Sequence, residues 1–391
     1  MPGRNSIMIL CKVVDNFGDI GVVYRLARAL SDIRPSLNLA LVVSNLDTFS
    51  ALAPRIDPRR QIQKFLYKNS EWTVIDWNLR AEDEDNFPVA AHGFQFPVIL
   101  ECFQCGRPEW LEKILFADDF TGSAQILNID YLTAEDYAEE FHLLKSGTRK
   151  TNVKKRFFMP GFTKKTGGLI IGDAQKNAGI KSQAESRRIS ASGRQFAIFF
   201  FAYDDDCAAV VRAVAGFQEK MRGADEDFSV TVFVAPGKSR APFVSAWEER
   251  GSPFNIERIP FLPQEEFDSF ILTMDFLFVR GEDSLARACL SGLPFVWQAY
   301  RQDENYQLVK VDALLERMRE FFPAEEFKTI QTFWQSYNDS GKQTDPAPLE
   351  TMLLSSALGK NTDGFRAFAE TLHQNGDLAR HLLDYIDSVA L

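Results

Sequence analysis

Short apolar segments alternate with segments of helical spacing along most of the chain, and this alternation occurs in two series. The first series starts with the apolar residues 6–14, followed by a helical pattern from residue 20. The second starts with the segment 195–203, "QFAIFFFAY", and continues to residue 300. Such alternation places the strands in parallel and the helices on both faces of the sheet. Each series therefore predicts a doubly wound, Rossmann-like α/β domain.

A change of composition separates the two series. Residues 163–194 are rich in Gly, Ser, Lys and Arg and poor in aromatic residues, which is typical of a linker. We expect an N-terminal domain over residues 1–171, a linker over 172–194 and a C-terminal domain over 195–391. The C-terminal domain ends in a helical layer, because the chain beyond about residue 304 shows only helical spacing. The predicted architecture is two Rossmann-like domains facing across a cleft, the default place for a site.

The composition is that of an ordinary soluble globular protein, with 45% apolar and 25% charged residues. A net charge of −10 argues against general nucleic-acid binding, which needs a basic surface to displace counterions from phosphates. No apolar run approaches the roughly 18 residues of a membrane helix, and the N-terminus lacks the pattern of a signal peptide. We therefore expect a cytoplasmic protein without nucleic-acid or membrane partners, and we expect it to be a monomer.

Cysteine and histidine residues form no metal-binding pattern. Cys102 and Cys105 make a CxxC motif, but no second pair or nearby histidine accompanies them. The four histidines are scattered in the sequence. We therefore expect no metal site, and a redox role for the CxxC motif is disfavoured.

The first strand–helix junction, "VVDNFGDIGVVYRLARAL", carries two carboxylates. Asp15 and Asp19 flank Asn16, Phe17 and Gly18 in the turn between the apolar strand and the helix. A turn of this kind points backbone N–H groups at the edge where open α/β sheets bind ligands. These residues are therefore candidates for a functional site. The alternative is that the two carboxylates only cap the helix.

A second strand–helix junction, "FVRGEDSLARACLSGLPFVW", carries a cation. The apolar strand 276–279 runs into Arg280, Gly281, Glu282, Asp283 and Ser284, and a helix begins after them with Asp283 or Ser284 as its cap. A helix N-terminus beside an arginine can hold an anion such as a pyrophosphate, and a glycine lets the backbone come close to it. The alternative is a capped helix with a surface arginine.

Two further segments fit a nucleotide in the second domain. Tyr203 ends the strand 195–203, and "FLPQEEF" places Leu262 and Pro263 before the amide of Gln264. An aromatic ring can stack on a base, and an amide can bond to its edge. No Walker loop or GxGxxG motif follows a strand, so P-loop and ordinary dinucleotide chemistry are disfavoured.

Together these segments resemble a known bacterial family, the protein-arginine rhamnosyltransferases that modify translation elongation factor P (EF-P). The similarity rests on "VVDNFGDIGVVYRLAR" and on "PFLPQEEFD…DFLFVRGEDSLARA…PFVWQAY", and it extends over nearly the whole chain. The blocks "NIDYLTAEDY", "FFMPGFTKKTGG" and "LVKVDALL" fit the family as well. Gln298 and Arg301 depart from the residues expected at their positions.

The resemblance implies a GT-B glycosyltransferase that transfers rhamnose from dTDP-β-L-rhamnose to an arginine of EF-P with inversion and without a metal. It places the general base on Asp19, with Asp15 as a second essential carboxylate. It makes Glu282 important for activity and assigns the rest of the segment 280–284 to the nucleotide diphosphate. Tyr203 and Gln264 match positions near the thymidine.

Arginine is cationic at any ordinary pH, so a carboxylate cannot deprotonate it beforehand. We expect Asp19, with Asp15 or Glu282, to grip the guanidinium and to take its proton as the C–N bond forms. Two other functions stay open at this point. One is a metal-independent nucleotide-sugar transferase with a small-molecule or lipid acceptor, and the other is a regulator that binds a nucleotide sugar without turnover.

A basic run, "KSGTRKTNVKKR" at residues 145–156, precedes the "FFMPGF" block. Most such runs are only solvated surface. The functional alternative is a patch that steers the acceptor, which the family resemblance leads us to expect to be acidic.

Overall fold

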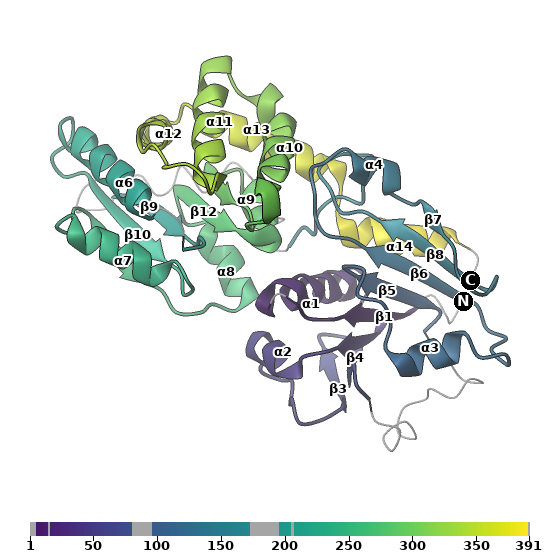
Figure 1. Ribbon diagram of the computed structural model, residues 1–391. Coiled ribbons are helices and arrows are strands. Elements are labelled where there is room, and N and C mark those ends of the chain that lie inside the picture. Colours follow the sequence, from purple (N-terminus) through teal and green to yellow (C-terminus); the bar gives the residue numbers. More distant parts are fainter. Residues whose placement is uncertain (1–4, 15, 80–95, 173–194, 205–206, 390–391) are drawn as a thin grey trace. The chain divides into compact units, whose positions relative to one another are not determined.

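The computed structural model describes residues 5–14, 16–79, 96–172, 195–204 and 207–389 (Figure 1). The chain divides into two compact units. Unit 1 comprises Met1–Ile171 together with Asn375–Leu391, and unit 2 comprises Gly172–Gln374. Nearly all of the predicted linker, 172–194, lies outside the described residues.

Unit 1 is built on an eight-stranded sheet whose six central strands are parallel. The strand order is β3-β4-β2-β1-β5-β6-β8-β7, and only the edge pairs β3–β4 and β7–β8 are antiparallel. The strands are β1 (Ser6–Cys11), β2 (Asn38–Val43), β3 (Ile62–Tyr67), β4 (Ser70–Asp76), β5 (Val98–Cys102), β6 (Ala124–Ile129), β7 (Lys145–Ser146) and β8 (Val153–Phe158). This topology confirms the predicted first α/β domain.

Helices cover both faces of this sheet, which is why β1 is apolar on both sides. The helices of unit 1 are α1 (Asn16–Ile33), α2 (Leu46–Leu52), α3 (Glu109–Leu115), α4 (Tyr137–Phe141) and α14 (Leu378–Ser388). Ile7 and Ile9 belong to the core beneath α1, α2 and α14, whereas Met8 and Leu10 belong to the core beneath α3. A strand buried on both faces shows a continuous apolar run rather than an alternation.

The C-terminal helix belongs to unit 1, and the domain boundary expected from the sequence is wrong there. The sequence assigned all of residues 195–391 to the second domain, but Leu382 and Ile386 of α14 are buried in the core of unit 1. The approach is close: a Cβ at Gly168, where φ is +80°, would lie 2.6 Å from the carbonyl oxygen of Gly376. The end of the "FFMPGFTKKTGG" block therefore packs against the chain at the start of α14.

Unit 2 is built on a five-stranded sheet in which all strands are parallel. The order is β11-β10-β9-β12-β13. The strands are β9 (Gln195–Phe200), β10 (Ser229–Val234), β11 (Asn255–Arg258), β12 (Phe276–Arg280) and β13 (Phe295–Gln298). The helices between them are α6 (Cys207–Arg222), α7 (Arg240–Glu249), α8 (Gln264–Ile271) and α9 (Gly281–Ser291). The predicted second α/β domain is confirmed.

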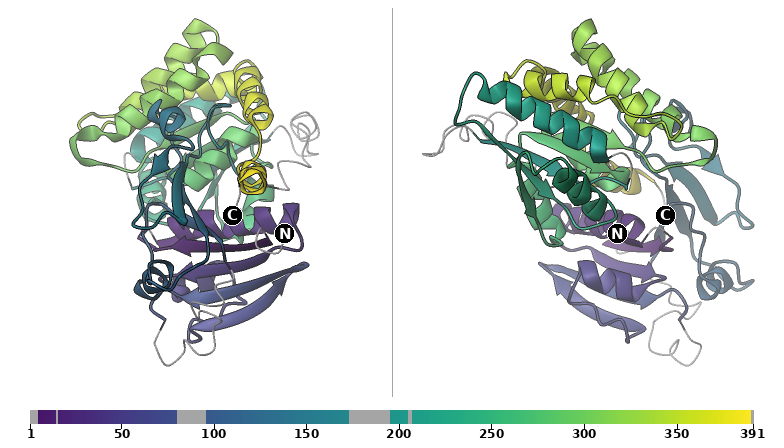
Figure 2. Two further views of the ribbon diagram at one scale, coloured as in Figure 1. Left: turned by 90° about the vertical axis from the view of Figure 1, so that its right-hand side faces the viewer. Right: turned by 60° about the vertical axis from the view of Figure 1, so that its left-hand side comes forward.

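A helical layer completes unit 2, as the sequence predicted. It consists of α10 (Gln307–Met318), α11 (Ala324–Asn338), α12 (Ala347–Ala357) and α13 (Thr362–Asn375). Helix α12 packs against α6, and α11 packs against α12 and β13; Figure 2 shows these helices from two further directions. Among the described residues, no helix is long and apolar enough to cross a membrane.

Candidate functional site

The candidate site of unit 1 lies where the strand order reverses. The chain winds outward from β1 in one direction through β2 and in the other through β5, so β1 and β5 flank the switch point. Ligands of open α/β sheets bind at the carboxyl ends of the strands at such a point. Asp19 lies in the first turn of α1, directly after β1, and only 4% of its surface is exposed. The structure therefore places the predicted base at the expected edge of the sheet.

The two oxygens of the Asp19 carboxylate have different neighbours. The backbone N–H of Val14 donates a hydrogen bond to Oδ2 at 2.8 Å, which ties the end of the turn to the helix. The hydroxyl of Tyr131 donates to Oδ1 at 3.4 Å. Asp19 thus ties the turn before α1 to the helix through one oxygen, while its other oxygen faces a residue that follows β6.

Tyr131, which follows β6, contacts this carboxylate, and Phe103, which follows β5, supports the ring of Tyr131; the sequence did not predict either residue as part of the site. The rings of Phe103 and Tyr131 stack with their centroids 4.6 Å apart. Phe103 and Gln104 both have positive φ, and the Gln104 amide donates to Asp130 at 2.8 Å. A signal for them existed, because "CFQC" and "NIDYL" lie where two neighbouring strands end at the same edge of the sheet.

The other predicted residues of this junction are placed only in part. Phe17 and Gly18 lie in the first turn of α1 and are exposed; for Phe17 the exposed fraction is 45%. Asp15 lies outside the described residues. Asn16 begins the helix. The roles of these residues stay predictions.

The cysteines near this edge are free thiols of raised pKa. Cys11 and Cys102 are buried, and burial raises the pKa of both. Burial also raises the pKa of Cys105 to about 12. A thiol of raised pKa stays protonated at neutral pH and reacts slowly. Within the described part of the chain, no group of three or more His, Cys, Asp or Glu residues could hold a metal ion.

The candidate site of unit 2 lies at the corresponding switch point, between β9 and β12. The guanidinium of Arg280 lies 4.5 Å from the ring centre of Phe201 and 4.7 Å from that of Tyr203. Gly281 follows with φ of +65° and begins α9. Two features therefore lie at one edge of this sheet. One is the Arg280 guanidinium, which lies over the rings of Phe201 and Tyr203, and the other is the N-terminus of α9.

Neighbouring groups hold these residues in place. Gln298, at the end of β13 and only 2% exposed, accepts the N–H of Tyr203 at 2.6 Å. The indole of Trp297 donates to the carbonyl of Gly281 at 2.9 Å. The hydroxyl of Ser284 donates to the carbonyl of Arg280. Gln298, which departs from the expected family residue, thus has a supporting role in this chain.

The remaining predicted residues of unit 2 lie on the carboxyl side of the same sheet. Glu282 and Asp283 are half-buried in the first turn of α9. Pro263 is the N-cap of α8, and Gln264, which is 8% exposed, is the first residue of that helix. Leu262 precedes them in the segment after β11 and is half-buried.

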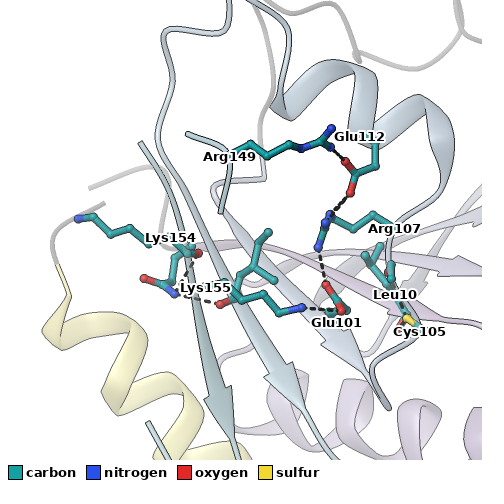
Figure 3. A network of polar contacts seen from close by, with 11 residues as sticks. Leu10, Glu101, Cys105, Arg107, Glu112, Arg149, Lys154 and Lys155 are labelled. Carbon is teal, nitrogen blue, oxygen red and sulfur yellow. Dashed lines mark hydrogen bonds and ion pairs between the residues drawn. The ribbon is translucent and has the colours of Figure 1, made fainter. Parts of the chain in front are cut away.

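The basic run is only partly a surface feature. Lys155 pairs with Glu101 at 2.8 Å, and Glu101 is 2% exposed. Arg107 also pairs with Glu101, at 2.7 Å, and Glu112 joins Arg107 to Arg149 (Figure 3). Buried charges of this kind are stable only when they are paired. Lys155 therefore belongs to an internal ion-pair network.

Solved structures share the architecture of this chain. A structure described as the basis for EarP-mediated arginine glycosylation of translation elongation factor EF-P matches with a TM-score of 0.54 and 21% identity, covering 98% of this chain and 99% of that chain. A glycosyltransferase of kitacinnamycin matches with a TM-score of 0.52 and 11% identity, covering 98% of both chains. At these identities the likeness shows the fold alone, and that fold is the two-domain GT-B fold of glycosyltransferases.

The chain belongs to the family described as elongation factor P (EF-P) rhamnosyltransferase EarP, whose model matches residues 7–387. The protein-arginine rhamnosyltransferase of Neisseria meningitidis serogroup B is 30% identical over 374 residues, 93% of this chain and 91% of that protein. The enzyme of the same description from Pseudomonas aeruginosa is 29% identical over 357 residues, 85% of this chain and 87% of its own length. The protein is therefore a glycosyltransferase, as the resemblance implied.

Proposed function

We propose that this protein transfers L-rhamnose from dTDP-β-L-rhamnose to a guanidine nitrogen of an arginine in EF-P, with inversion and without a metal ion. One observation carries the proposal: the switch point of unit 1 holds a buried carboxylate, and that of unit 2 holds an arginine beside a helix N-terminus. A transfer from a nucleotide sugar to a cationic acceptor needs both kinds of site.

The donor is assigned to unit 2. A diphosphate is a dianion or trianion, and it is stabilised by a guanidinium and by the N–H groups of a helix N-terminus. Arg280 and the start of α9 offer both. These groups also stabilise the charge that grows on the diphosphate as the sugar leaves, so the proposed reaction has its electrostatic assistance without a metal.

The acceptor is assigned to unit 1. A guanidinium is attracted to a carboxylate, and the planar cation pairs with it in a defined geometry. Asp19 is held by Val14 and Tyr131, so its orientation is set before the acceptor arrives. As the C–N bond forms at the anomeric carbon, the guanidinium loses its proton to Asp19 and dTDP departs with the bonding electrons. Asp15 and Glu282 remain the predicted helpers.

A direct test uses purified protein, EF-P and a panel of dTDP and UDP sugars, with the intact mass of EF-P as the readout. We expect a mass gain of one deoxyhexose with dTDP-β-L-rhamnose, and the same gain in the presence of EDTA. An EF-P variant with lysine in place of the modified arginine is the matched acceptor control and should gain no mass. Loss of transfer in EDTA would overturn the metal-free part of the proposal.

The same assay separates the two other functions. Release of dTDP with a lipid or small-molecule acceptor, but not with EF-P, would establish a different acceptor class. Binding of dTDP-rhamnose without release of dTDP under any condition would indicate a nucleotide-sugar regulator.

A further inference from the structure

We infer that Tyr131 is a positioning residue that orients the carboxylate of Asp19 for the acceptor. The inference rests on the proposed role of Asp19 as the base. It concerns a residue that lies 112 positions away in the sequence and reaches Asp19 only through the fold.

The hydrogen bonds from Val14 and Tyr131 reach different oxygens of the Asp19 carboxylate. The N–H of Val14 binds Oδ2 at 2.8 Å. The Tyr131 hydroxyl reaches the other oxygen, Oδ1, at 3.4 Å. This contact is long for an O–H···O bond, and contacts in a catalytic site commonly shorten when substrate binds. Tyr131 therefore limits the rotation of the carboxylate while leaving Oδ1 able to accept a further proton.

The structure fixes the ring of Tyr131 with unusual backbone conformations. Phe103, whose ring stacks on Tyr131, has φ of +58°, and Gln104 has φ of +51°. Positive φ is unfavourable for residues other than glycine, and it persists where the surroundings enforce it, often at functional sites. The N–H of Phe103 bonds to Ile129 at 2.7 Å, and Gln104 bonds to Asp130 at 2.8 Å. The turn after β5 is thereby tied to the end of β6.

A purely structural role does not account for Tyr131. A tyrosine that served only the core would be buried, whereas 40% of Tyr131 is exposed at the edge of the sheet. Its hydroxyl points to the buried carboxylate of Asp19 at the switch point. Tyr131, which is held by Phe103, therefore supports Asp19 from a loop other than the one that carries Asp19.

The test is the variant Tyr131→Phe, which keeps the ring and its stack on Phe103 but removes the hydroxyl. We expect kcat for EF-P to fall about 10-fold, because a hydrogen bond to a charged group is lost. The KM for EF-P, the Kd for dTDP and the Tm should stay at wild-type values. Phe103→Leu, which removes the supporting ring, should lower kcat in the same direction with an unchanged Kd for dTDP.

Tyr137→Phe is the matched control, because Tyr137 is also 40% exposed and lies in unit 1 on α4. It should behave as the wild type. A mutant cycle then tests the route of the effect: in single-turnover reactions, Asp19→Asn with Tyr131→Phe should lose no more activity than Asp19→Asn alone.

Three results would overturn the inference. They are a wild-type kcat in Tyr131→Phe, a loss seen only in the KM for EF-P, and an additive loss in the Asp19→Asn background. Failure of the wild-type protein to modify EF-P would remove the proposed function, and the inference with it. The result for the wild type therefore tells the two failures apart.

Discussion

Asp19 combines two roles that are usually separate. One oxygen holds the turn that starts α1, and the carboxylate as a whole is the proposed base. A substitution must therefore keep the hydrogen bond while removing the charge, or the loss of the turn will be mistaken for a loss of chemistry. Asparagine meets this requirement, because its amide oxygen can still accept from Val14.

Asp19→Asn should reduce transfer to EF-P below about 1% of the wild type, since a general base contributes roughly 10² to 10⁴ in rate. Calorimetry should show unchanged dTDP binding, because the donor is assigned to unit 2. Asp47→Asn is the matched control: Asp47 is an exposed carboxylate in the first turn of α2. Loss of dTDP binding in Asp19→Asn would instead indicate a structural residue.

Arg280→Ala should weaken dTDP binding by about 10- to 100-fold, because a charged hydrogen bond is worth about 1.5 to 3 kcal/mol. Arg280→Lys should recover part of the affinity, since lysine keeps the charge but lacks the planar group that lies over Phe201 and Tyr203. Arg250→Ala, at an exposed arginine that ends α7, is the control. Wild-type affinity in Arg280→Ala would move the phosphate site elsewhere.

At the scale of elements, α4, β8 and α14 meet around His142. This residue is the C-cap of α4, packs edge-on against Phe158 of β8 and accepts the N–H of Met159 through Nδ1. Burial, and then the neighbouring His381 of α14, lowers the pKa of His142 to about 4. The packing of these three elements therefore requires a neutral imidazole.

This requirement gives a pH dependence of definite sign. Between pH 6.5, the ordinary pKa of histidine, and about pH 4, the unfolded chain binds a proton at this site that the folded chain does not. Stability should therefore fall as the pH falls through this range. In His142→Gln the decrease in Tm between pH 7 and pH 5 should be smaller than in the wild type. Equal decreases would show that His142 does not contribute.

The sequence predicted those features that depend on neighbouring residues and missed those that depend on contacts between distant segments. Both strand–helix junctions were predicted, because a junction can be recognised from consecutive residues. The structure places Asp19 and Arg280 at the two switch points. Tyr131 and Phe103 were missed, because only the pairing of β1, β5 and β6 brings them to Asp19. The predicted placement of α14 was wrong for the same reason. The apolar spacing of α14 predicts that one face is buried, but only the tertiary structure shows that it packs in the core of unit 1 near Gly168.

At the scale of the whole molecule, fewer residues of the basic run can steer the acceptor than the sequence suggested. The exposed cations of the run are Lys145, Arg149 and Lys154, but Arg149 pairs with Glu112 and Lys155 pairs with Glu101 in the ion-pair network of unit 1. Lys155→Glu would place a second negative charge beside buried Glu101, so a loss of activity in that variant would report unfolding. A test of electrostatic steering must leave Arg149 and Lys155 unchanged.

The double variant Lys145→Glu and Lys154→Glu should raise the KM for EF-P at low salt and leave kcat and dTDP binding unchanged. Steering by exposed charges acts on association and fades with salt, because screening is strong beyond about 10 Å at 0.1 M. The control makes the same change of charge elsewhere, at Lys64 and Lys328. Identical acceptor kinetics in both double variants and the wild type would show that the run does not steer the acceptor.

The return of α14 to unit 1 also has a consequence for how the chain is made. During synthesis from the N-terminus, the core beneath α1 lacks Leu382 and Ile386 until all of unit 2 has left the ribosome. At about 5 to 20 residues per second, this interval lasts roughly 10 to 40 seconds. Unit 1, which is translated first, is therefore completed last. The apolar surface that α14 will cover stays accessible to chaperones while unit 2 is being synthesised.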